Sequence, residues 1–553
     1  MFSHRVFAND RNAIKVTFPK QGTECFDCVF LAMEIVDSES FDRLLRDRSA
    51  LLLSHCVHCV ELGAEEFQLT RPLLNFLQAE SSQLEELLDA YGAKSNEMWH
   101  AFRSHVAMIK NFSAAGYDLL HLRHTIHSYD FQGHYPKMEE DTDSAITYIS
   151  VFLFCSLKQV MKDAMCLGWP PPEELIGYDY SELLPSGMLP KDRIMGSRED
   201  AEHLVIHLAT SFLNNTEDAK FLDNAAKCRA PQWRGLNFDL LSEASIRSME
   251  EKFHTLQSLY DTYISYSNIE GNDVSLRRLR GHISVVLHLL RVATVFIHFY
   301  ERHIKIQGDS LFCHSNCVLK SNWYLELLTH YLCRYSYEFL VGARGLCQSM
   351  LRQYAVVGTK EIPIPPYFGF HVRPATLISS IVRHYGSPVT LTLDKEYDAS
   401  IPMNLFLANE WVNQLKRQHV GDELAKMGDE VAKLQKGIDS EKITTADAVM
   451  ELLRRMANMN LIRVLVYPLD VEPLIKSSTA TGLLELMQSV VATLHAQRKI
   501  NILFSIKVSF HGDIRVLEDI QILAENGYGE NETGANIPLP RELSYLSHYH
   551  PMN

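Results

Sequence analysis

Two residues with reactive or phosphate-binding side chains, His371 and Arg373, stand close together in the segment 368–376. The segment reads Phe-Gly-Phe-His-Val-Arg-Pro-Ala-Thr. A neutral imidazole is a nucleophile, and a guanidinium group can bind two oxygens of one phosphate through parallel hydrogen bonds. The pair therefore predicts a site at which a histidine carries a phosphoryl group.

The neighbouring residues predict how this pair is positioned. Three prolines within 361–366 exclude a helix there, because each proline fixes its own φ and pushes the preceding residue out of the α region. Apolar residues then recur at helical spacing over 377–382, Pro374 suits the first turn of a helix, and Gly386 suits its end. We expect His371 at the helix N-terminus, where free N–H groups and the helix dipole favour an anion.

The same pattern occurs in a known family. The motif Gly-x-His-x-Arg-Pro-Ala resembles the active-site motif of HPr, the histidine phosphocarrier of the bacterial phosphoenolpyruvate-dependent phosphotransferase system. The matching residues are Gly369, His371, Arg373, Pro374 and Ala375. A hairpin candidate over 389–403 and a helix that begins within 404–407 extend the resemblance. Gram-positive members are commonly regulated through a serine at the position of Asn404, so we do not expect that regulation in this chain.

The resemblance implies roles for individual residues. An enzyme I-type donor would transfer its phosphoryl group to a ring nitrogen of His371, which is Nδ1 in the family. The phosphoryl group would then pass to an unknown acceptor protein. An apolar patch beside the histidine would dock these partners. The implied residues are His371 and Arg373 for catalysis, Gly369, Val372 and Arg373 for phosphate binding, and Met403, Leu405 and Phe406 for docking. No cofactor is implied.

The length of 553 residues suggests three or four domains, at roughly 150 residues per domain. We predict an α+β multidomain protein, in which a large, mostly α-helical region over 1–355 precedes an HPr-like open-faced β-sandwich over 356–498. The helical region resembles no family that we identify, and it contains a candidate subdomain break near 170–197. A helical hairpin over 413–460 would interrupt the HPr-like domain. Residues 499–553 would form a β-containing extension and tail.

The end of the HPr-like domain depends on which apolar segments continue the family pattern. Apolar residues at helical spacing over 424–434 indicate the inserted hairpin. In our interpretation the pattern then resumes with 461–467 as the last strand and 483–494 as the last helix. Alternating apolar residues over 504–510 predict a further strand in the extension.

Composition limits the function classes. A net charge of −15 and a pI near 5.9 argue against a nucleic-acid binder, whose surface would carry a basic stripe. The start of the chain lacks the pattern of a signal peptide. Of the two most apolar segments, 145–157 is too short to span a bilayer, and 283–300 is interrupted by charged or titratable residues. We expect no membrane insertion, a cytoplasmic location and reduced cysteines.

Metal binding is an alternative. Four cysteines in two C-x-x-C pairs could supply thiolates to zinc, namely Cys25, Cys28, Cys56 and Cys59. The second pair lies in an apolar, helix-like context without the glycines of a zinc knuckle, which favours buried reduced thiols. Three histidines over 121–127 could share one helix edge, but such clustering arises by chance among 25 histidines.

Three functions therefore remain open. The first is a phosphocarrier or phosphorylation-dependent regulatory protein, rather than a turnover enzyme, that accepts a phosphoryl group on His371. The second is an interaction scaffold that keeps the HPr-like fold without phosphotransfer, and the third is a metal-binding helical protein. The chain has no Walker loop and no Gly-x-Gly-x-x-Gly fingerprint, so it shows no nucleotide site of its own. Solvent access to His371 separates the first two hypotheses.

Overall fold

The computed structural model describes residues 35–129, 131, 136–171, 180–182, 198–228, 241–265, 270–271, 273–304 and 321–548. The chain divides into two compact units, Met1–Ala50 and Leu51–Asn553. The division falls within the first helix, α1 (Ser38–Leu62), and all later elements belong to the second unit.

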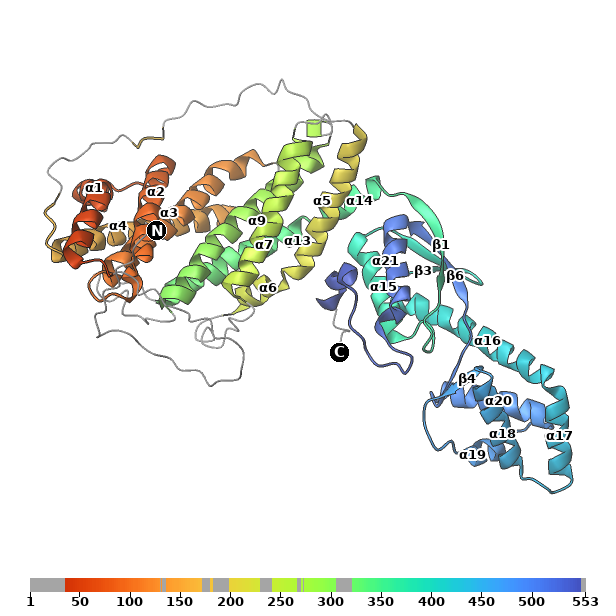
Figure 1. The fold of residues 1–553 in the computed structure, drawn as a ribbon. Helices are drawn as coiled ribbons and strands as arrows, with labels where there is room; N and C mark the ends of the chain where they lie inside the picture. The colour runs from red at the N-terminus through yellow and green to blue at the C-terminus, as the bar shows by residue number, and fades with distance from the viewer. Residues whose placement is uncertain are drawn as a thin grey trace, which may run out of the picture. The chain divides into compact units, whose positions relative to one another are not determined.

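Long helices make up most of the described part of residues 51–355 (Figure 1). They are α2 (Arg71–Ala90), α3 (His100–Thr125), α4 (Pro136–Cys166), α5 (Arg198–Asp218), α6 (Lys220–Lys227), α7 (Glu243–Leu259), α9 (Val274–Phe299), α12 (Ser321–Glu326), α13 (Arg334–Gly342) and α14 (Arg344–Gln353). The π-helical turns η4 (Tyr260–Ile264), η5 (Tyr300–Ile304) and η6 (Leu327–Cys333) extend or join them. A mostly helical chain with a small β component, which is what the sequence predicts at this level, is thus confirmed.

Helix α9 is the core helix of this region, and it contacts α3, α7 and α13. Asp273 caps its start by accepting a hydrogen bond from the Ser275 N–H at 2.8 Å. By length and composition alone, the segments 137–166 and 274–302 could each cross a membrane, and a buried core helix passes the same test. Of the most apolar window in 274–302, 78% is buried inside the protein.

The second region is built on a four-stranded antiparallel sheet. Its strands are β1 (Val357–Pro363), β2 (Val389–Thr392), β3 (Glu396–Asp398) and β6 (Lys507–Asp513), in the order β1-β6-β2-β3. Helix α15 (Val372–Tyr385) links β1 to β2, α16 (Pro402–Lys426) follows β3, and α21 (Ile514–Glu525) follows β6. Helix α21 packs against β1, β6 and α15 (Figure 1), so the start of α15 is fixed by the sheet region.

The interpretation of 461–467 as the last strand of this sheet is wrong. Strand β4 (Ile462–Val464) pairs with β5 (Ile500–Ile502) in a separate two-stranded sheet, and β6 takes the place between β1 and β2. In β6, Val508 and Phe510 are buried while Ser509 and His511 alternate with them, which suits a strand with one face on a core. A short, mostly apolar segment such as 461–467, in which Arg463 is the one charged residue, carries no such information on its partner strand.

The interruption of the four-stranded sheet is therefore longer than the predicted hairpin over 413–460. It also contains β4 and β5, and its helices after α16 are α17 (Gly428–Asp439), α18 (Thr445–Asn458), α19 (Glu472–Ser477) and α20 (Leu483–Ala496). These elements and the end of α16 share one apolar core that includes Leu424, Leu452 and Met487. The segment 483–494, predicted as the last helix of the sheet domain, belongs to this insertion as α20, and the predicted boundary at residue 498 falls between α20 and β5.

Candidate functional site

His371 caps the N-terminus of α15, as the sequence predicts. Its backbone is extended (φ −80°, ψ −168°), its carbonyl accepts the first helical hydrogen bond from the Ala375 N–H at 3.0 Å, and the helix ends at Gly386 with φ +65°. The N–H groups of Val372 and Arg373, at the first two helical positions, have no acceptor among the described residues. These groups and the helix dipole therefore face the histidine without a partner of their own.

The loop before His371 is held by one amide from α16. Asn409 Oδ1 accepts from the Phe370 N–H at 2.8 Å, and its Nδ2 donates to the Phe368 carbonyl at 3.0 Å. Two successive residues, Phe368 and Gly369, have positive φ of 52° and 67°. A Cβ on Gly369 would overlap Asn409 Oδ1, so the position requires glycine both for its backbone conformation and for space.

The imidazole of His371 is covered. Its side chain is 12% exposed, and that of Glu530, which contacts it, is 7% exposed. Nε2 lies 3.0 Å and 3.1 Å from the two carboxylate oxygens of Glu530, and Nδ1 lies 3.0 Å from the Gly369 carbonyl oxygen. Both ring nitrogens thus face acceptors, and only a ring with a hydrogen on each nitrogen satisfies both at once.

Glu530 belongs to a segment of the C-terminal tail, 526–537, which we call the covering segment. The Gly529 carbonyl accepts a hydrogen bond from Arg373 Nε at 3.0 Å, and the Ile537 N–H donates to the same carbonyl at 2.9 Å. Tyr528 is fully buried, and its hydroxyl donates to the Pro363 carbonyl at 2.6 Å. The covering segment therefore holds both residues of the predicted catalytic pair, His371 and Arg373.

The residues predicted for partner docking are only partly at the surface. Met403 is exposed and Phe406 is half-buried, but Leu405 is fully buried, so Leu405 is wrong as a docking residue. The reason is helical geometry, because α16 turns Leu405 toward the interior while Met403 and Leu407 face solvent. Val372, on the first turn of α15, is a further exposed apolar residue.

The cysteine alternative loses support where the structure describes it. Cys25 and Cys28 lie outside the described residues. Burial raises the pKa of both other thiols, that of Cys59 to about 11, which disfavours the thiolate form that binds zinc. No group of three or more His, Cys, Asp or Glu in the described ranges is placed to share a metal ion. Cys155 is disulfide-bonded, contrary to the expectation of reduced cysteines throughout.

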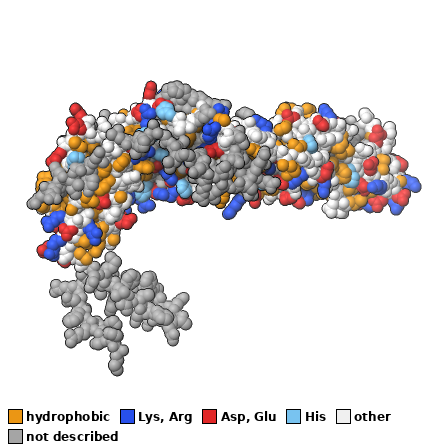
Figure 2. Space-filling view, turned by 90° about the horizontal axis from the view of Figure 1, so that it is seen from above, with side chains coloured by type: hydrophobic (Ala, Val, Ile, Leu, Met, Phe, Trp, Pro, Cys, Tyr) orange, Lys and Arg blue, Asp and Glu red, His pale blue; other side chains and the backbone are white. Residues whose placement is uncertain are grey.

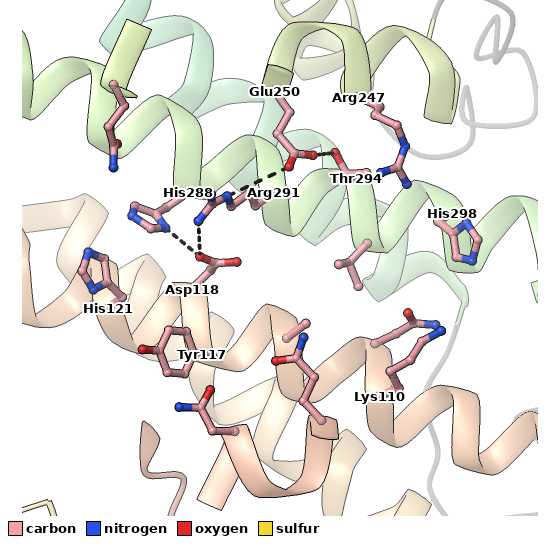
Figure 3. Close-up of a pocket in the computed structure, with 16 residues that line it drawn as sticks. Lys110, Tyr117, Asp118, His121, Arg247, Glu250, His288, Arg291, Thr294 and His298 are labelled. Atoms are coloured by element: carbon pink, nitrogen blue, oxygen red, sulfur yellow. Dashed lines mark hydrogen bonds and ion pairs between the residues drawn. The ribbon is translucent and has the colours of Figure 1, made fainter. Parts of the chain in front are cut away.

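A second site lies between two helix pairs in the helical region, where α2 and α3 face α7 and α9. The cleft has a volume of about 730 Å³ (Figure 3). The lining side chains lie one helical turn apart on each helix, for example Asp118 and His121 on α3 and His288 and Arg291 on α9. The lining residues of each helix therefore present their polar groups to the same cleft.

Two carboxylates in the cleft have partners. Asp118 Oδ1 lies 2.6 Å from His288 Nδ1, and Glu250 Oε2 accepts from the Thr294 hydroxyl at 2.6 Å. The guanidinium of Arg291 lies between these two carboxylates, with nitrogen–oxygen distances of 3.8 Å and 4.0 Å (Figure 3). Both distances exceed hydrogen-bonding range, and Arg291 has no hydrogen bond to any described residue.

Histidines mark one end of the cleft. The rings of His121 and His288 lie with their centroids 4.4 Å apart (Figure 3). Burial, together with the adjacent His288, lowers the pKa of His121 to about 4, so this imidazole is neutral near pH 7. Of the three histidines predicted along one helix edge, only His121 lines the cleft, while His124 bonds the Leu120 carbonyl.

This cleft is not among the sites predicted from the sequence. A signal was present, because His288, Arg291 and His298 recur at helical spacing inside α9, one of the two long apolar helices of the described residues. Elsewhere, on the face shown in Figure 2, basic and acidic side chains of the described residues are interspersed, without a continuous basic stripe.

Comparisons with models of known families, with curated proteins and with solved structures found no match to this chain.

Proposed function

We propose that the region of the four-stranded sheet is a regulatory module that is phosphorylated on histidine, of the HPr-like kind. In this proposal His371 accepts a phosphoryl group from an enzyme I-type donor, and the covering segment holds His371 unreactive until it is displaced. The observation that carries the proposal is the start of α15, where His371, Arg373 and two N–H groups without acceptors converge. A phosphoryl group on the imidazole would be bound by the same cation and N–H groups.

The order of elements supports the same proposal. The resemblance predicts a helix that begins at the histidine, a hairpin, a second helix, a last strand and a last helix. The elements α15, the β2–β3 hairpin, α16, β6 and α21 follow in that order once the insertion between α16 and β6 is set aside. The motif and the element order are separate features of the chain, and both agree with the resemblance.

The proposed transfer requires a change at the imidazole. For Nδ1 to attack phosphorus, this nitrogen must release its proton to solvent, keep its lone pair and leave its contact with the Gly369 carbonyl at 3.0 Å. The bond between phosphorus and the donor nitrogen then breaks as the bond to Nδ1 forms, and the phosphoryl charge grows where Arg373 can neutralise it. The carboxylate of Glu530 opposes this step, because it covers the ring and repels an incoming anion.

The test uses the full chain, phosphoenolpyruvate and an enzyme I preparation that is shown to phosphorylate an ordinary HPr. We expect an acid-labile, base-stable phosphate, which His371→Ala abolishes and Arg373→Ala slows by roughly a hundredfold, as loss of a charge-stabilising donor does elsewhere. Mass spectrometry of the intact protein measures the label. If the wild type and a variant with Glu530 removed both stay unlabelled, the proposal fails.

One observation favours the second hypothesis, an interaction scaffold without phosphotransfer. The 12% exposure of His371 is low for a residue that must meet a donor protein. In the scaffold hypothesis the contact between His371 and Glu530 is purely structural, and its removal exposes no phosphorylation site. The same labelling experiment therefore separates the two functions.

A further inference from the structure

The cleft between the α2–α3 and α7–α9 pairs is independent of His371, and its side chains suggest a ligand. Its volume of about 730 Å³ falls within the range of small-molecule sites, roughly 300 to 1,000 Å³, and is larger than a bare inorganic anion needs. The lining is polar rather than apolar, unlike that of a typical hydrophobic pocket. A ligand for this cleft must therefore supply many hydrogen-bonding groups.

Several side chains that line the cleft have no hydrogen-bond partner in the part of the chain that the structure describes. Among the described residues, the carboxamides of Asn75, Gln78 and Asn111 and the hydroxyl of Tyr117 make no side-chain hydrogen bond. Gln257 Oε1 is buried and also has no partner. Carboxamide and phenol groups both donate and accept, so a set of them is suited to hydroxyl groups, which do the same.

The charged groups of the cleft favour one anionic group on the ligand. Lys110, Arg247 and Arg291 are cationic, and the first two already pair with Glu85 and Glu243 outside the lining. Arg291 is different, because among the described residues its ion pairs are the two long ones and its N–H groups make no hydrogen bond. A guanidinium in this state can bind two oxygens of a carboxylate or phosphate.

The two acidic side chains beside Arg291 do not prevent it from binding an anionic group. Asp118 is held by His288 at 2.6 Å and Glu250 by Thr294 at 2.6 Å, so each has its own donor. Figure 3 shows Arg291 between them, with Lys110, Arg247 and His298 farther along the same cleft. An anionic group can therefore meet Arg291 while the rest of the ligand contacts the amides.

We propose that this cleft binds a small, hydroxyl-rich organic anion, of the class of sugar acids and sugar phosphates. The anionic group would bind Arg291, and the hydroxyl groups would bind the carboxamides of α2 and α3 and the Tyr117 hydroxyl. The helical region would then be a ligand-binding domain attached to the sheet region.

The proposal is tested by isothermal titration of the full-length protein with a panel of probes. The panel is glucose 6-phosphate, fructose 6-phosphate and glucuronate. Glucose is the uncharged control, and inorganic phosphate is the control without a sugar. We expect at least one charged sugar to bind with millimolar affinity or tighter, and at least tenfold more tightly than either control, since each charge-assisted hydrogen bond is worth roughly tenfold or more.

Variants connect binding to the cleft. Arg291→Ala should weaken the binding of the charged sugar by roughly tenfold to a hundredfold, and Arg291→Lys should restore only part of it, because lysine keeps the charge but loses the fork. The matched control is Arg334→Ala, which removes an arginine of similar exposure on α13, outside the cleft. Circular dichroism spectra of the variants exclude misfolding.

Three results would overturn the proposal. The first is that no charged sugar binds at 10 mM, a limit set at roughly the weak end of millimolar affinity. The second is that inorganic phosphate or glucose binds as tightly as the charged sugars, which would remove either the hydroxyl or the anionic part of the recognition. The third is that Arg291→Ala binds as the wild type does.

Discussion

At His371 the imidazole of the site is paired within the chain itself, whereas in the helical cleft several polar side chains have no hydrogen-bond partner among the described residues. Glu530 contacts Nε2 of His371, the Gly369 carbonyl contacts Nδ1, and the Gly529 carbonyl accepts a hydrogen bond from Arg373 Nε. In the cleft, Arg291 and the Tyr117 hydroxyl make no hydrogen bond to described residues.

This difference indicates two ways in which a site can depend on a ligand. At the His371 site an internal carboxylate covers the imidazole at Nε2, and Nδ1, where the proposed function places a phosphoryl group, faces the Gly369 carbonyl. A phosphoryl donor must therefore first displace part of the protein. The cleft needs no such displacement, because its unpaired groups are exposed to whatever enters it. Substitutions should therefore affect the stability of the first site and the ligand affinity of the second.

The largest effect is expected at Gly369. Gly369→Ala places a Cβ on Asn409 Oδ1 at a backbone φ of +67°, and both strain and overlap should destabilise the His371 loop, by about 3 kcal/mol in total. Urea unfolding measures the change. Gly527→Ala is the control, because Gly527 has φ +64° but open space around it, and should cost only about 1 kcal/mol. Equal effects of the two variants would show that Asn409 does not restrict the loop.

A smaller effect tests the comparison directly. His371→Ala leaves the buried carboxylate of Glu530 without its partner, and we expect a loss of about 2 kcal/mol together with faster amide exchange in the covering segment. Tyr117→Phe in the cleft removes a hydroxyl without a protein partner and should change stability by less than about 0.5 kcal/mol. Hydrogen exchange and urea unfolding measure both variants. A larger loss of stability in Tyr117→Phe than in His371→Ala would contradict the difference between the two sites.

The smallest effect concerns pH. Burial lowers the pKa of His282, on the same helix as Arg291, to about 4 from an ordinary value of 6.5. Between these values the unfolded chain binds more protons, so stability rises with pH from 4 to 6.5 and falls as acid is added. His282→Asn keeps a donor for the Phe339 carbonyl and should reduce the loss between pH 7 and pH 5.5 by roughly 1 kcal/mol. An unchanged pH dependence of the urea midpoint would contradict this assignment.

The local parts of the His371 site could be predicted from sequence, and the long-range parts could not. The three prolines within 361–366, together with Pro374 and Gly386, fix where α15 begins and ends. Their effects on φ and on hydrogen bonding act within a few residues. Glu530 lies 159 residues from His371, in a Gly- and Asn-rich tail that gives no local signal of this contact.

The same limit explains the other errors. The apolar run 461–467 indicates a strand but not the sheet that it joins, since strand partners are chosen by tertiary packing. Leu405 is apolar, as a docking residue should be, yet the side of α16 that faces the core decides its burial. The cleft combines stripes from four helices, each of which alone resembles an ordinary polar face of a helix.

The most direct test of the central claim, that Glu530 keeps a phosphorylatable His371 unreactive, is the rate of phosphoryl transfer to the full chain from phosphoenolpyruvate and enzyme I. Glu530→Ala should raise the initial rate at least about tenfold, which corresponds to the roughly 1.4 kcal/mol expected for a lost charge-assisted contact. The matched control is Glu532→Ala, which removes a more exposed carboxylate of the same segment that pairs with Arg463 and should leave the rate unchanged. Equal rates in both variants and the wild type, or no label on His371 in any of them, would contradict the account.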